Sequence, residues 1–138
     1  MDFGFKKKYV SLDSCVILRI MLRDNLEQTE RAKALILGSQ NFYVDDVAII
    51  ECVYVLEKKH YTRVEIAEFI QSFLLNPMIF HDNSIFDGIF EKYVSHPSLS
   101  FEDLVLASRN EQHGYAPLWT FDQKFARQSK VAKLVPTA

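Results

Sequence analysis

Four acidic residues, Asp13, Glu51, Asp103 and Asp122, lie at the edges of hydrophobic segments that are far apart along the chain. An acidic side chain in an apolar segment must find a partner or a cation, or else its pKa shifts until it is neutral. Three of the four lie where we expect a strand to end or a helix to begin, and in an open α/β sheet such ends meet at one crevice. Because several carboxylates without a cation repel one another, the pattern predicts a site for a hard divalent metal.

Three of these acids also have a purely structural explanation. Asp103 would lie in the first turn of a helix and Asp122 at a helix N-cap, where acids stabilise helices without any catalytic role. Glu51 has apolar neighbours on both sides, so we expect a buried glutamate that pairs with Lys58 or reaches out from a helix edge. The four histidines are scattered without the spacing of a metal or base motif, and we assign them no role.

The composition indicates one globular domain over residues 1–138, because 49% of the residues are hydrophobic and can bury a substantial core. The formal net charge of −2 hides an asymmetry. No acid follows Asp122, whereas Lys124, Arg127, Lys130 and Lys133 come at close intervals. This basic end could neutralise phosphates, or it could be a solvated helix face.

Cysteine usage and hydropathy predict a cytoplasmic protein without a membrane segment. Cys15 and Cys52 lie among apolar residues and lack zinc-ligand spacing, so we expect buried, reduced thiols. Residues 1–10 carry a basic cluster, but no apolar stretch of signal-peptide length follows it. No apolar run approaches the roughly 20 residues that a membrane span needs.

Strand-like and helix-like segments alternate along the chain without an internal repeat or a long linker, which favours the α/β class. We expect strands at residues 9–13, 42–44, 78–82, 116–121 and 131–135. We expect helices at 15–23 and 28–37, and further helices that begin near residues 45, 62, 83, 100 and 122, with Asn83 or Ser84 able to cap the one near 83.

Three of these helices carry local signals. Residues 45–59 are rich in β-branched side chains that favour a strand, but their length and the leading aspartates favour a helix, which we predict. Thr62 and Glu65 have the spacing of a capping box. Ser100 precedes a segment with acids in its first turn and Gly114 at its end, the polarity that the helix macrodipole prefers.

In order and in motifs, the chain resembles the PIN-domain ribonucleases, and its small size is similar to that of the VapC-type toxins of toxin–antitoxin pairs. The resemblance runs from Tyr9 to Val135 and rests on LDSCVIL, a helical Glu51 and DLVLASRNEQHGYAPLWTFDQKF. It implies a three-layer α/β/α sandwich with a mostly parallel central sheet. The chain departs from the commoner pattern at Cys15 and Trp119, neither of which is one of the acids.

The resemblance also implies a metal-dependent active site for hydrolysis of RNA phosphodiester bonds. Carried over, the acids that bind Mg²⁺ or Mn²⁺ are Asp13, Glu51, Asp103 and Asp122. Ser14 and Thr120 would be supporting hydroxyls that hold a carboxylate or a water in place. Whether the site holds one metal or two cannot be read from the pattern.

The implied substrate is single-stranded or looped RNA, in which backbone and bases are accessible. Lys124, Arg127 and Lys130 would guide its phosphates toward Asp122. A VapC-type toxin further implies a homodimer and a protein antitoxin whose C-terminal segment lies in an apolar groove. Helices at 15–23 and 28–37, with Ile20, Leu35 and Ile36, are candidate walls of that groove, and ordinary core packing explains them equally well.

Other functions remain open at this stage. A housekeeping RNA-processing PIN nuclease would have no antitoxin, and a non-catalytic module would bind RNA or protein without cleavage. A receiver or acid phosphatase also places aspartates at strand ends, but the segment that begins at Asp13 lacks the second aspartate of a D-x-D nucleophile loop.

Overall fold

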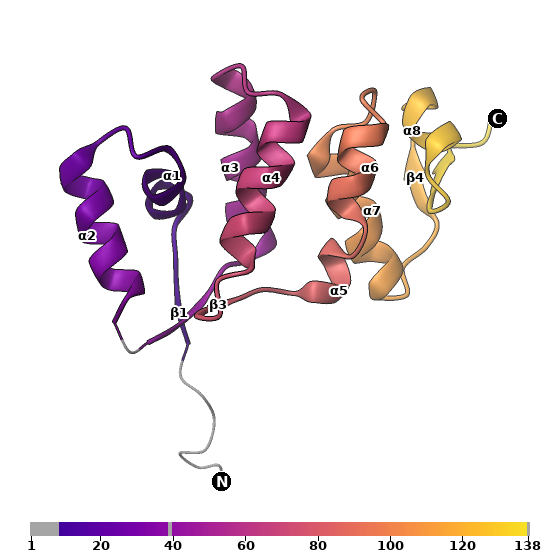
Figure 1. Ribbon diagram of the computed structural model, residues 1–138. Coiled ribbons are helices and arrows are strands. Elements are labelled where there is room, and N and C mark those ends of the chain that lie inside the picture. Colours follow the sequence, from indigo (N-terminus) through magenta and orange to yellow (C-terminus); the bar gives the residue numbers. More distant parts are fainter. Residues whose placement is uncertain (1–8, 39, 138) are drawn as a thin grey trace, which may run out of the picture. The chain divides into compact units, whose positions relative to one another are not determined.

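The computed structural model describes residues 9–38 and 40–137, so the basic residues 6–8 lie outside the described part of the chain (Figure 1). Its internal contacts divide the chain into two compact units, Met1–His81 and Asp82–Ala138. The prediction of a single domain stays a prediction.

The first unit contains a parallel sheet with the strand order β1 (Tyr9–Ser11), β2 (Asn41–Tyr43) and β3 (Ile79–Phe80). Phe42 lies opposite Val10 on one side and Ile79 on the other, and its side chain is fully buried. Parallel neighbours need long crossover connections, which helices usually supply. Here those helices are α1 (Ser14–Leu22), α2 (Leu26–Ile36), α3 (Asp46–Lys58) and α4 (Arg63–Leu74).

Helices α3 and α4 begin where the local signals predict. The segment with mixed signals is helical, with Asp45 as its N-cap and a carboxylate that accepts a 3.0 Å hydrogen bond from Ala48 N. Its buried residues lie on one helical stripe, so packing of that stripe agrees with the cap and outweighs the strand preference of its β-branched side chains. At α4, Thr62 and Glu65 form the reciprocal capping box.

The second unit contains α5 (Asn83–Phe86), α6 (Ile89–Ser95), α7 (Phe101–Gln112) and α8 (Gln123–Gln128). Two parallel strands, β4 (Leu118–Thr120) and β5 (Ala132–Leu134), pair with each other. Phe86, Phe90, Tyr93 and Phe101 form an aromatic core that holds α5, α6 and α7 together.

The predicted helices differ from the observed ones mainly in the residues at their ends. Ser100 caps α7, and Gly114 follows its end with a φ of +76°, as predicted. The predicted cap of α5 was wrong by one residue: Asp82 is the N-cap, because its carboxylate accepts from Ser84 N at 3.1 Å. Parallel strands joined by helices confirm the α/β class. Within the described residues, none of the helices combines the length and the apolar character that a membrane crossing requires.

Candidate metal centre

Asp13 lies at the junction of β1 and α1, with its carboxylate exposed. Although Asp13 occupies the N-cap position, its side chain makes no capping hydrogen bond. Its two oxygens instead accept hydrogen bonds from the Ser14 hydroxyl and the Cys15 thiol, each at 3.3 Å. The bond from the thiol contributes most to lowering the pKa of Asp13 below its usual value. Asp13 is therefore held as an anion.

Glu51 lies in the middle of α3 and is exposed, so the prediction of a buried glutamate was wrong. Ile49 and Cys52 lie on the stripe of the helix that packs into the core, whereas Glu51 lies outside that stripe, as does the exposed Tyr54. The predicted partner, Lys58, lies over the ring of Tyr54 with its Nζ 5.0 Å from the ring centroid. Among the described residues, no ion pair joins Lys58 to Glu51.

The Cys52 thiol shows that Asp13 and Glu51 share one neighbourhood. Cys52 is fully buried, with Sγ 3.8 Å from the backbone oxygen of Ser14. Burial raises the pKa of Cys52 to about 12, and the negative charges of Glu51 and Asp13 add to the rise. Glu51 directly precedes Cys52 in the chain and Asp13 directly precedes Ser14, so the contact between Cys52 and Ser14 places the two acids on neighbouring segments. The first unit thus brings two of the four predicted acids together.

The two thiols were missed as neighbours of the site. Cys52 is buried as predicted, but Cys15 is exposed because it stands in the first turn of α1 and points toward the Asp13 carboxylate. Two signals in the sequence could have indicated this. Cys15 comes two residues after Asp13, at a helix start. Cys52 directly follows Glu51 in the sequence and belongs to the apolar stripe of the helix.

In the second unit, Asp103 lies half-buried in the first turn of α7, and its backbone N–H donates to Ser100 Oγ at 3.0 Å. Burial raises the pKa of Asp103 above its usual value, while the hydrogen bond from Ser100 opposes that rise. The charges of Asp122 and Glu102 raise it further. The negative charge of Asp122 therefore reaches the Asp103 carboxyl.

Asp122 is the N-cap of α8: its Oδ1 accepts from Phe125 N at 3.0 Å. Its own backbone N–H donates to Thr120 Oγ1 at 2.9 Å. The hydroxyl of Thr120 thus holds the backbone of Asp122, and Ser14 contacts the carboxylate of Asp13. Within the described part of the chain, no hydrogen bond uses Asp122 Oδ2. One oxygen of Asp122 therefore caps the helix while the other stays open to a ligand.

The predicted basic residues lie on or just after α8. Lys124 and Arg127 belong to the helix, Lys130 follows it, and all three are exposed. Over residues 9–38 and 40–137, none of the three forms an ion pair. Their charge is available to an anionic ligand.

The donor set suits a hard cation. Carboxylate oxygens are the ligands that Mg²⁺ and Mn²⁺ prefer, and the two acid pairs, Asp13 with Glu51 and Asp103 with Asp122, consist only of such donors. Each unit contributes two of the four predicted acids. In the described residues, no group of three or more His, Cys, Asp or Glu side chains surrounds a common metal position.

Comparison with known proteins adds the family. The model of the PIN domain family matches residues 10–131, which is most of the chain. A search of curated proteins finds no match. PIN domains are generally metal-dependent nucleases, so the match accounts for carboxylates at the ends of parallel strands and the starts of helices. It also confirms the predicted resemblance to PIN domains and the PIN-like α/β class. The chain therefore belongs to the PIN domain family.

Proposed function

We propose that the protein is an endoribonuclease that depends on Mg²⁺ or Mn²⁺ and is the toxin of a type II toxin–antitoxin pair. The observation that carries the nuclease proposal is the half-buried Asp103, in a chain of a nuclease family: burial raises its pKa, and the negative charge of Asp122 adds to that rise. Repulsion between like charges is relieved by a cation. No cationic side chain forms an ion pair with either acid in the described residues.

The proposed ligands are the two acid pairs, Asp13 with Glu51 and Asp103 with Asp122. When bound, the divalent cation supplies positive charge that stabilises the phosphoryl and leaving oxygens during hydrolysis. The chain's own groups hold the ligands in place. Ser14 donates to the Asp13 carboxylate, and Thr120 fixes the backbone of Asp122.

The proposed substrate is unpaired RNA. Lys124 and Arg127 lie within one and a half turns of the Asp122 cap, and Lys130 follows. Three exposed cations after an active-site acid can neutralise the phosphates on one side of the cut bond. An unpaired strand also leaves its backbone open to a site built from short side chains.

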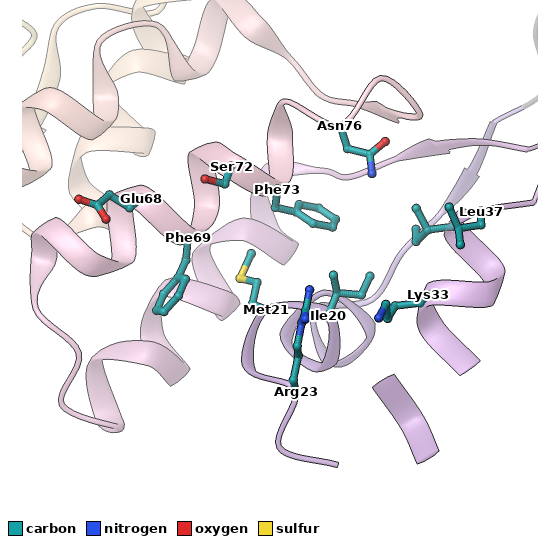
Figure 2. A pocket seen from close by; sticks show the side chains of 11 residues that line it. Ile20, Met21, Arg23, Lys33, Leu37, Glu68, Phe69, Ser72, Phe73 and Asn76 are labelled. Atoms are coloured by element: carbon teal, nitrogen blue, oxygen red, sulfur yellow. The ribbon is translucent and has the colours of Figure 1, made fainter. Parts of the chain in front are cut away.

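The proposed antitoxin site is a groove of the first unit with a volume of about 490 Å³. Side chains from α1 lie between those from α2 and α4, as Figure 2 shows. Its apolar lining includes Met21, Phe69 and Phe73, while Arg23 and Glu68 supply opposite charges. Of the predicted wall residues, Ile20 and Ile36 line this groove, whereas Leu35 lines a neighbouring one. An amphipathic segment of a partner fits such a surface.

The proposed toxin function also bears on the oligomeric state and the cellular location. The resemblance to VapC-type toxins supports a homodimer that acts in the cytoplasm, and we retain the proposal of one domain over residues 1–138. Sedimentation of the purified chain tests the dimer directly.

Metal-dependent RNA cleavage tests the nuclease proposal. We expect the purified chain to cut a stem-loop RNA with Mn²⁺ and to lose that activity in excess chelator. Asp103→Asn should lose about 100-fold or more, the scale for removing one group that stabilises developing charge. The matched control is Asp87→Asn, because Asp87 is an exposed aspartate of the same unit outside the acid pairs.

A second readout does not depend on turnover. A ligand that binds only the folded protein stabilises it by about 2.7 kcal/mol at 100 times its Kd. Mn²⁺ should therefore raise the Tm of wild type and of Asp87→Asn, and raise it little in Asp13→Asn or Asp103→Asn. Full cleavage in excess chelator, or equal activity of the two variants Asp103→Asn and Asp87→Asn, would reject the metal mechanism. RNA that is bound but never cut would favour the non-catalytic alternative.

A further inference from the structure

Phe121 stands out because its side chain is 82% exposed although it lies between two residues of the candidate site, Thr120 and Asp122. A phenylalanine left in water loses the free energy that burial would provide. Isolated exposed apolar residues are ordinary on protein surfaces. Phe121 differs from them by its position, one residue before a proposed metal ligand.

The backbone on both sides of Phe121 is fixed. Asp122 N donates to Thr120 Oγ1 at 2.9 Å, which closes a tight turn around Phe121. Thr120 O accepts from Val135 N at 3.0 Å, and the Asp122 carboxylate accepts from Phe125 N at 3.0 Å. The backbone that carries the exposed ring is therefore held beside Asp122.

The chemistry around the turn matches one nucleotide better than an apolar partner. A carboxylate for the cation lies at Asp122, and an exposed ammonium lies two residues later at Lys124. Phe121 directly precedes this charged pair in the chain. A base joined to a phosphate has the same layout, a π face beside an anion, and unpaired bases stack on aromatic side chains. A purely apolar protein segment would have to desolvate the neighbouring charges.

We propose that Phe121 stacks on an unpaired base of the RNA beside the phosphodiester that is cut, and so helps to select the substrate. This inference rests on the proposed nuclease function. It assigns to Phe121 a positioning role, whereas the acids hold the cation and the basic residues hold phosphates.

Binding of single-stranded RNA tests the stack, measured in the Asp103→Asn background so that the RNA stays intact. Phe121→Ala should weaken binding by about five- to a hundred-fold, the range for one base on an aromatic ring. Phe121→Trp should keep the affinity, and Phe121→Leu should lose it because leucine has no π face. Leu75→Ala is the matched control, since Leu75 is also 82% exposed and lies outside the site.

An abasic scan locates the base. Removing the base at one position of the RNA should weaken binding to the protein that keeps Phe121 and add nothing to the effect of Phe121→Ala, because both changes remove the same stack. Equal effects of the abasic nucleotide in both proteins would overturn the proposal. So would unchanged affinity in Phe121→Ala.

Thermal unfolding separates stacking on RNA from packing on protein. We expect the same Tm for wild type and Phe121→Ala. A lower Tm that Phe121→Leu restores would mean that the ring packs against the protein, and stacking would be wrong. If the wild-type chain cuts no RNA but Phe121→Ala still loses affinity for it, the stack stands and the nuclease function falls.

Discussion

At the residue scale, the Asp122 carboxylate can cap a helix with one oxygen and bind a cation with the other. Oδ1 caps α8 through Phe125 N, and the charge of the group reaches Asp103. A cap needs an acceptor but no charge, and asparagine caps a helix about as well as aspartate. A metal ligand needs the anion. The two tasks can therefore be separated by the choice of substitution.

Asp122→Asn should keep the stability of the metal-free protein and lose Mn²⁺-dependent cleavage. Asp122→Ala should lose the cleavage and also about 1 kcal/mol of stability, because it removes the cap. Urea unfolding and RNA cleavage measure the two effects.

Thr62→Ala provides the inverse control for this pair of variants. It removes the cap of α4, at Glu65 N, and leaves the four proposed ligands in place. We expect a similar loss of stability with cleavage retained. Normal cleavage by Asp122→Asn would reduce Asp122 to a helix cap.

At the element scale, α8 combines a capping acid at its start with cations along its length. Arg127 in the last turn also suits the helix dipole, which favours positive charge there by up to about 1 kcal/mol. These cations could thus serve only to stabilise a solvated helix, without any contact to RNA. The salt dependence of RNA binding distinguishes the two explanations, because only phosphate contacts release counterions.

Reversal of the charges at Lys124, Arg127 and Lys130 should weaken RNA binding and flatten its dependence on salt. Each lost contact to a single strand lowers the slope of log K against log salt by about 0.7, so three lost contacts lower it by about 2. Lys92→Glu on α6 is the control for a change of net charge alone. A slope equal to that of wild type would leave α8 as a solvated face.

At the scale of the whole molecule, the proposed toxin depends on a partner as much as on its active site. The groove of the first unit is edged by Leu37, an apolar residue that is 84% exposed. Burial of such a residue by an antitoxin segment would contribute to binding, and a charge introduced there would have to be desolvated.

Leu37→Glu should therefore weaken inhibition of the ribonuclease by a protein encoded beside its gene, by about tenfold or more. Leu75→Glu, the same change at a residue of similar exposure outside the groove, should leave inhibition intact. RNA cleavage without the inhibitor should match wild type in both variants. If no neighbouring product inhibits an active nuclease, the chain is a housekeeping PIN nuclease.

Local patterns in the sequence determined the elements and their ends. The capping box of Thr62 and Glu65 is an interaction between residues three apart and was predicted correctly, as was the start of α7 directly after Ser100. The helical choice for residues 45–59 was correct for the same reason: a cap and a helical stripe of apolar residues act over short distances. The order of strands and helices then indicated the PIN-like α/β class, which the family match confirms.

Exposure and proximity were decided only by the tertiary structure. Glu51 and Cys15 were expected among buried groups, and both are exposed. Apolar neighbours in the sequence do not bury a helical residue, because successive residues point about 100° apart and packing chooses one stripe. Likewise, the charge of Asp13 acts on Cys52 and the charge of Asp122 acts on Asp103 across long stretches of chain, and folding alone brings those residues together.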